Sequence, residues 1–139
     1  ASKTQLMVGL GVSSISDSWY AFAQNVKTVE EYYEVLESGK IPIFRGHELN
    51  EEDLIIRKHI LDIMCHYETA WKTKDMQHQS VLDALSRLSE IEADGFIELA
   101  DNSLTVTEKG KPFVRNICMA FDARLMRNKP STQLFSMTI

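Results

Sequence analysis

The sequence lacks a hydrophobic run long enough to cross a membrane. A spanning helix needs roughly 20 consecutive apolar residues, whereas the longest candidate, residues 6–12, is short and contains two glycines. We therefore expect no membrane partner. The chain begins Ala1-Ser2-Lys3-Thr4, without a start methionine or a secretory leader, so we expect it to be internally cut or tagged.

Cysteine and proline are also scarce. The two cysteines, Cys65 and Cys118, lie far apart and neither belongs to a C-x-x-C pair. This argues against a disulfide scaffold and favours a reducing, cytoplasmic location. The three prolines mark local turns, and no Pro- or Ser-rich linker divides the chain.

Composition and length are those of a folded protein. Hydrophobic residues make up 44% of the 139 positions and charged residues 25%, as in ordinary globular chains. This length suits one compact domain, or a smaller core with an appended piece, but not two full-sized domains. One core is the simpler expectation.

The charge balance disfavours nucleic acid as a partner. The net charge is −5, and affinity for a phosphate backbone comes from neutralising its charge. Residues 107–139 are an exception, because their basic residues outnumber their acidic ones. We expect no nucleic-acid partner.

The apolar run at residues 6–12 is typical of a strand buried on both faces, as in a parallel sheet. The remaining sequence offers no obvious parallel partner for such a strand. We therefore expect its neighbouring strands to lie outside this sequence.

Two helices have clear N-terminal signals. Thr28 and Glu31 form a capping box, and Gly39 supplies a left-handed stop, so a helix is predicted between them. Asn50 precedes three acidic residues and can cap a longer helix, in which apolar residues recur every three or four positions up to Tyr67.

The later elements follow the order of a winged-helix module. Ser80 resembles an N-cap and Gly95 a C-terminal stop, so a third helix is predicted between them. Residues 96–106 predict a hairpin, and residues 113–125 predict a final amphipathic helix that Pro130 ends. We therefore expect a mainly α fold with a small β hairpin, arranged as a winged-helix-like helical domain.

The segment GLGVSS at residues 9–14 has some features of a phosphate-binding loop, since glycines let backbone amides approach an anion. It lacks the third glycine of a dinucleotide fingerprint and the lysine of a Walker loop. The alternative is a strand whose glycines allow another backbone to come close.

Histidine and cysteine do not form a metal motif. His59 and His66 are seven residues apart on one predicted helix, with Cys65 beside them. On a helix Cys65 points about 100° away from His66, and no spacing matches a metal signature. We expect surface or capping histidines and no metal site.

The winged-helix order suggests DNA binding as a function, because the helix before the hairpin would enter the major groove. Residues 80–94 carry Arg87 against four acidic residues, a charge that phosphates would repel. A winged-helix interaction or DNA-binding module therefore remains an alternative of lower rank.

Eight short segments, taken together and in order, resemble one enzyme family. They are GLGVSSIS at 9–16, YAFAQNVK at 20–27, EYY at 31–33, RG at 45–46, LNEEDLIIRKHILDIMC at 49–65, TEKG at 107–110, RNICMAFD at 115–122 and the terminal FSMTI. The chain is similar over nearly its whole length to oxygen-independent coproporphyrinogen III oxidase, a radical S-adenosylmethionine oxidoreductase of haem biosynthesis.

The resemblance implies a C-terminal piece of that enzyme. Family members hold a 4Fe-4S cluster through a C-x-x-x-C-x-x-C motif in an N-terminal barrel, and this chain has no such motif. Residues 1–27 would be the end of the truncated (β/α) radical S-adenosylmethionine barrel, with its last strand, and residues 28–48 a connecting helix and loop. Residues 49–139 would form the winged-helix-like lid, whose partner is the barrel of the same protein.

The resemblance also implies an activity for the whole enzyme. The cluster cleaves S-adenosylmethionine, and the resulting radical abstracts hydrogen from propionates of coproporphyrinogen III, two of which leave as carbon dioxide to give protoporphyrinogen IX. We expect this piece alone to be inactive, with no catalytic residue and no metal ligand. A paralogous radical S-adenosylmethionine protein that handles haem is a further alternative.

Three positions are candidate binding residues by the same resemblance. Gln24 and Ile43 fall where the family contacts a second S-adenosylmethionine, and an amide such as Gln24 can both donate to and accept from a polar ligand. The alternative for Gln24 is a side chain bonded to backbone. Arg45 is a candidate substrate-binding residue, because arginine grips carboxylates with two parallel hydrogen bonds.

Overall fold

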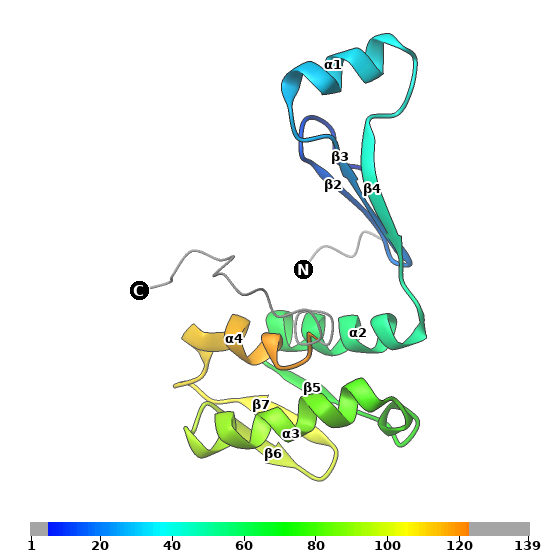
Figure 1. The fold of residues 1–139 in the computed structure, drawn as a ribbon. Helices are drawn as coiled ribbons and strands as arrows, with labels where there is room; N and C mark the ends of the chain where they lie inside the picture. Colours follow the sequence, from blue (N-terminus) through cyan, green and yellow to red (C-terminus); the bar gives the residue numbers. More distant parts are fainter. Residues whose placement is uncertain (1–5, 123–139) are drawn as a thin grey trace. The chain divides into compact units, whose positions relative to one another are not determined.

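The computed structural model describes residues 6–122. The chain divides into two compact units, Ala1–Leu54 and Ile55–Ile139, instead of sharing the single core that we considered simpler. Strands and helices occur in both units (Figure 1). The expectation of a mainly α fold is therefore wrong, and the fold is mixed.

The first unit contains a four-stranded antiparallel sheet in the order β1-β2-β3-β4 (Figure 1). Helix α1 lies between β3 and β4 in the sequence. The elements are β1 (Leu6–Met7), β2 (Ile15–Ser18), β3 (Ala21–Asn25), α1 (Val29–Glu37) and β4 (Ile43–Glu48).

The strand expected at residues 6–12 is wrong in length, direction and burial. Only Leu6 and Met7 are in strand conformation, antiparallel to β2, and Leu6 is 60% exposed. Gly11 adopts a φ of +96° and Ser13 a φ of +59°, so the chain turns back where a straight strand was expected. Residues 43–48, expected as part of a loop, form β4.

The predicted helix caps of the first unit are confirmed. The Thr28 side chain accepts a hydrogen bond from the Glu31 amide at 3.4 Å, and Gly39 has a φ of +73° after α1. Asn50 Oδ1 accepts from the Asp53 amide at 2.8 Å, as expected of a residue that opens helix α2 (Glu51–His66).

The second unit follows the predicted order of helix, helix, hairpin and helix, with one additional strand. Strand β5 joins the hairpin to form a three-stranded sheet in the order β5-β7-β6. The elements after α2 are β5 (Glu68–Ala70), η1 (Asp75–Gln77), α3 (Gln79–Ala93), β6 (Ile97–Ala100), β7 (Ser103–Val106), η2 (Lys111–Phe113) and α4 (Val114–Met119).

Two helix boundaries differ from the prediction. Helix α3 begins at Gln79, so Ser80 lies inside it, with a buried hydroxyl that has no hydrogen-bond partner in the described part of the chain. Helix α4 ends at Met119, well before Leu125. Leu125 and the predicted stop at Pro130 lie outside the described residues.

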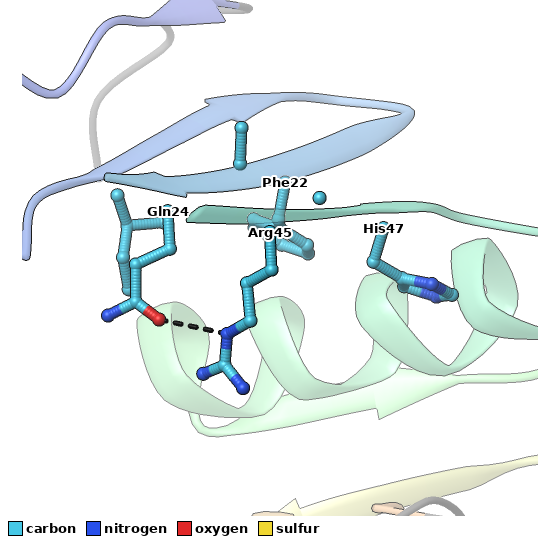
Figure 2. Close-up of a pocket in the computed structure, with 7 residues that line it drawn as sticks. Phe22, Gln24, Arg45 and His47 are labelled. Carbon is cyan, nitrogen blue, oxygen red and sulfur yellow. Dashed lines mark hydrogen bonds between the residues drawn. The ribbon is translucent and has the colours of Figure 1, made fainter. Parts of the chain in front are cut away.

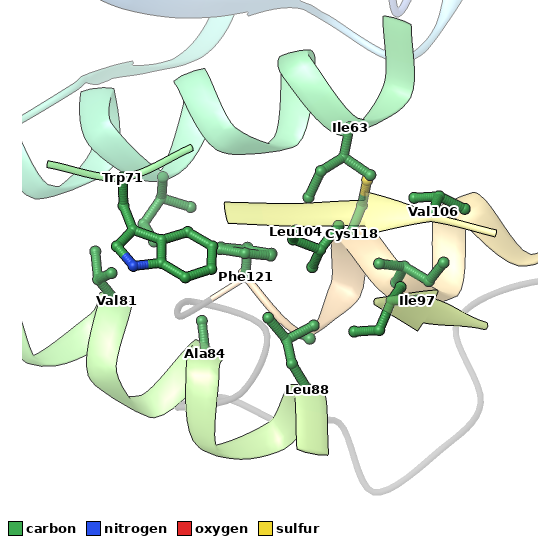
Figure 3. Close-up of a cluster of buried hydrophobic side chains, with 13 residues drawn as sticks. Ile63, Trp71, Val81, Ala84, Leu88, Ile97, Leu104, Val106, Cys118 and Phe121 are labelled. Atoms are coloured by element: carbon green, nitrogen blue, oxygen red, sulfur yellow. The ribbon is translucent and has the colours of Figure 1, made fainter. Parts of the chain in front are cut away.

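The hydrophobic core belongs to the second unit. Side chains from α2, α3, β6, β7 and α4 converge in one cluster (Figure 3). Ile63, Leu88, Leu104 and Phe121 have no exposed surface there. In the first unit, by contrast, Val26 is the only described hydrophobic side chain that is buried.

Candidate functional site

One face of the first unit's sheet carries the candidate site. Gln24 on β3 lies directly opposite Arg45 on β4, and Phe22 lies opposite His47. Because side chains alternate between the faces of a sheet, these four share one face (Figure 2). They border a pocket of about 360 Å³, whose lining residues are Ile15, Phe22, Ala23, Gln24, Arg45, Gly46 and His47.

Gln24 holds the arginine in place. Its Oε1 accepts a hydrogen bond from Arg45 Nε at 3.0 Å (Figure 2), and its Nε2 donates to the Ser13 carbonyl at 3.3 Å. The amide therefore bridges the β2 side of the sheet and Arg45. Gln24 is thus bonded to backbone, as in the alternative interpretation of this residue. Its second amide N–H can still donate to a ligand.

His47 is held in a similar way. Its Nε2 lies 3.3 Å from Asp53 Oδ2, and Asp53 is fixed because the same oxygen accepts from the Asn50 amide at 3.1 Å. The Asn50 cap of α2 thus orients an acidic group toward a pocket residue. The sequence reasoning did not single out His47, although it alternates with Arg45 along β4.

Ile43 is not among the residues that line this pocket. It pairs with Asn25 at an irregularity of the β3–β4 register, and its side chain is half exposed. The structure thus brings two of the three predicted site residues together, Gln24 and Arg45, but leaves Ile43 outside the group.

The glycine segment is organised by side chains of the first unit. Asn25 Nδ2 donates to the carbonyls of Gly9 and Gly11, at 3.2 Å and 2.9 Å. The Gly9 amide donates to Ser16 Oγ, and the Gly11 amide donates to Tyr32 Oη. These two amides are occupied, so this segment is not preorganised for a phosphate.

His59 contradicts the expectation of surface histidines. It has no exposed surface, and Nδ1 lies 2.8 Å from Thr69 Oγ1, while the buried Nε2 has no hydrogen-bond partner among residues 6–122. Burial lowers the pKa of His59, and neighbouring Lys58 adds to this effect. His66 is exposed, as expected.

The described residues do not fit an iron-sulfur cluster. Cys65 and Cys118 are both free thiols, whereas such clusters are held by sets of cysteine thiolates. Burial raises the pKa of Cys118 to about 11, which disfavours the thiolate that a metal needs. Within residues 6–122, no group of three or more His, Cys, Asp or Glu residues is placed to hold a metal ion.

Helix α3 is unsuited to a nucleic-acid groove. Its one basic residue, Arg87, donates to the Ala120 carbonyl at 2.7 Å, while Asp83, Glu90 and Glu92 leave the helix acidic. Separately, among the helices of residues 6–122, none has the length and apolar character of a membrane span.

Comparison with known proteins gives consistent results, although no protein-family model matches the chain. An oxygen-independent coproporphyrinogen III oxidase of Synechocystis is 33% identical over 142 residues, which cover 96% of this chain and 30% of the relative. The oxidase of the same name from Escherichia coli is 32% identical over 138 residues, with the same coverage.

A solved structure gives the same match. Coproporphyrinogen III oxidase from Escherichia coli, described as a radical SAM enzyme, superposes with a TM-score of 0.77 at 30% identity. The match covers 86% of this chain and 29% of that one. This chain thus spans about 30% of the length of its relatives, and the resemblance found in the sequence is confirmed.

Proposed function

We propose that this chain, a homologue of one part of the oxygen-independent coproporphyrinogen III oxidases, is the C-terminal part of such an enzyme and covers its active site. The complete protein would convert coproporphyrinogen III to protoporphyrinogen IX in haem biosynthesis. The observation that carries the proposal is a match to oxidases of this name over 96% of the chain.

The first unit has few buried hydrophobic side chains, which supports the proposal that another part of the complete protein packs against it. Of the large hydrophobic side chains that are exposed in residues 6–122, most belong to this unit, including Leu10, Tyr20 and Ile41. Such apolar surface normally packs against another surface. We propose that residues 1–27 complete the radical S-adenosylmethionine barrel and that residues 28–48 connect it to the rest of the chain.

The second unit would form the lid. We propose that it is a winged-helix-like domain, because α2, α3, the hairpin β6–β7 and α4 follow that order and β5 adds the third strand. Its closed core supports a rigid body that packs on the barrel as a whole. The acidic α3 favours a protein neighbour over DNA.

Three residues would contribute to binding. Gln24 and Ile43 would approach a second S-adenosylmethionine, and Arg45 would bind a substrate carboxylate. S-adenosylmethionine, cleaved at a 4Fe-4S cluster elsewhere in the complete protein, supplies the radical chemistry. This chain would bind neither group independently and would be inactive without the barrel.

The reaction of the complete protein tests the proposal. We expect the anaerobically purified protein, with its cluster loaded, to form protoporphyrinogen IX from coproporphyrinogen III only when S-adenosylmethionine and a reductant are present. Residues 1–139 alone should form none. Failure of the cluster-loaded protein to decarboxylate the substrate would overturn the proposed activity.

Arg45 provides a second test within the same assay. We expect Arg45→Ala to raise the KM for coproporphyrinogen III, and Lys40→Ala, at an exposed position outside the pocket, to leave it unchanged. An unchanged KM and turnover in Arg45→Ala would remove Arg45 from the substrate site.

The free thiols of Cys65 and Cys118 support a cytoplasmic location, which fractionation of cells would test.

A further inference from the structure

An arginine and a histidine project from the same face of β4 at the pocket. Arg45 and His47 are two residues apart, which on a strand corresponds to about 7 Å. Both line the pocket (Figure 2). Their side chains are long enough to approach one small anion placed between them.

Each of the two is already oriented by a partner and still has donors to offer. Arg45 uses Nε for Gln24. The two terminal nitrogens of its guanidinium make no hydrogen bond within residues 6–122 and are directed away from the strand (Figure 2). His47 directs Nε2 at Asp53, so Nδ1 is the ring nitrogen available to a ligand.

The pair suits a carboxylate. A guanidinium offers parallel N–H groups that match the two oxygens of a carboxylate, and a histidine that donates from both ring nitrogens is positively charged. Asp53 on one side and a ligand carboxylate on the other would both stabilise that charge.

Apart from Gln24, the rest of the lining is apolar. Ile15 and Phe22 border the pocket and keep 51% and 36% of their surface exposed. A ligand with an apolar body and a carboxylate arm would cover these side chains and reach Arg45 and His47 at the same time.

We propose that Arg45 and His47 together bind one carboxylate of the ligand, whose apolar body rests on Phe22 and Ile15. Gln24 and Asp53 act as positioning residues for Arg45 and His47. The inference rests on the proposed function, in which the ligand is a tetrapyrrole with propionate arms, and it adds His47 to the substrate site.

Binding of coproporphyrin III, which carries four propionates and fluoresces, tests the pair in the complete protein. We expect Arg45→Gln and His47→Gln each to raise the Kd for coproporphyrin III about tenfold, because each variant loses one charge-assisted hydrogen bond. Because both residues would hold the same carboxylate, the double variant should lose clearly less than the product of the two single losses.

Matched controls separate the pocket from general charge effects. Lys40→Gln removes a positive charge and His66→Gln removes a histidine, each at an exposed position outside the pocket, and both variants should bind as the unchanged protein does. Phe22→Ala should also weaken binding, because the apolar body loses its contact. Circular dichroism checks that every variant is folded.

The outcomes distinguish this inference from the proposed function. If the complete protein turns over coproporphyrinogen III but the two Gln variants bind coproporphyrin III normally, the carboxylate pair is wrong and the activity stands. If binding depends on both residues while no turnover occurs, the activity is wrong and the pair stands. Multiplicative losses in the double variant, or no binding by the unchanged protein, would overturn the pair.

Discussion

Gln24 and Arg45 face each other across β3 and β4, and Gln24 Oε1 accepts a hydrogen bond from Arg45 Nε at 3.0 Å. The glutamine is itself tied to the Ser13 carbonyl. A flexible arginine is therefore held in one orientation before any ligand arrives, which reduces the entropy lost on binding.

Substitution of Gln24 separates positioning from cofactor contact. We expect Gln24→Leu to raise the KM for coproporphyrinogen III several-fold, because Arg45 loses its acceptor. Gln24→Glu keeps an acceptor for Nε but loses the bond to the Ser13 carbonyl, so it should restore this KM only in part. The KM for S-adenosylmethionine, measured in parallel, should rise in Gln24→Leu if Gln24 also approaches that cofactor. A tetrapyrrole KM that does not change in Gln24→Leu would contradict the positioning role.

Replacing the neighbouring amide of Asn25 by a carboxylate should destabilise the first unit, unlike the same change at Gln24. Asn25 Nδ2 donates to two glycine carbonyls and to Ser14 Oγ, and Asn25 is only 6% exposed. Asn25→Asp replaces the donor by a charged oxygen that faces other oxygens, which should cost about 1–3 kcal/mol.

Hydrogen exchange measures this difference locally. The amides of Ser13 and Asn25, which donate to the carbonyls of Val26 and Ser14, should exchange faster in Asn25→Asp and remain protected in Gln24→Glu. Equal protection in the two variants would show that Asn25 does not organise the turn.

Local signals were enough to predict the helices. Thr28, Asn50 and Gly39 act through neighbours three or four residues away, so their patterns could be interpreted without the fold. The order of helix, helix, hairpin and helix in the second unit follows from such signals together with the hairpin at residues 96–106. The structure adds β5, whose three residues are too few to produce a pattern.

The sheet of the first unit could not be predicted in the same way. Strands β2 and β3 contain Ser, Asp, Ala and Asn and few β-branched residues. Strand β3 also pairs with β4 across the whole of α1. The apolar run at residues 6–12 does not form the predicted strand, because Gly11 adopts a positive φ and permits a turn. The approach of Gln24 to Arg45 likewise depends on a register that the sequence does not encode locally.

Two leucines of α3 provide a matched test of the core. Leu88 has no exposed surface, whereas Leu82 is 38% exposed. We expect Leu88→Ala to lower the free energy of unfolding by about 2–5 kcal/mol and Leu82→Ala to lower it by much less. Urea unfolding of the chain, followed by far-ultraviolet circular dichroism, compares them. Equal losses would contradict the placement of the core in Figure 3.

The stability of the second unit should fall in mild acid because of His59. The Thr69 hydroxyl donates to Asp62 Oδ2, so Thr69 Oγ1 accepts from His59 Nδ1 and the neutral ring leaves Nε2 unprotonated. A second proton would create a buried donor that no described residue accepts from. Burial and Lys58 lower the pKa of His59, and Asp75 and Asp62 only oppose this.

The direction of the pH effect follows from the lowered pKa of His59. At a pH below the ordinary pKa of 6.5 and above the folded value, the unfolded chain binds more protons than the folded one. Stability is therefore complete above this range and declines as the pH falls, by at most about 1.4 kcal/mol per pH unit for one group.

Urea unfolding at pH 7.5 and 5.5 should show the decline in the unchanged chain and in His66→Gln, whose site is exposed. His59→Gln, which cannot take up this proton, should have a smaller difference between the two pH values even if it is less stable at both. The same difference in all three proteins would mean that other groups control the acid sensitivity.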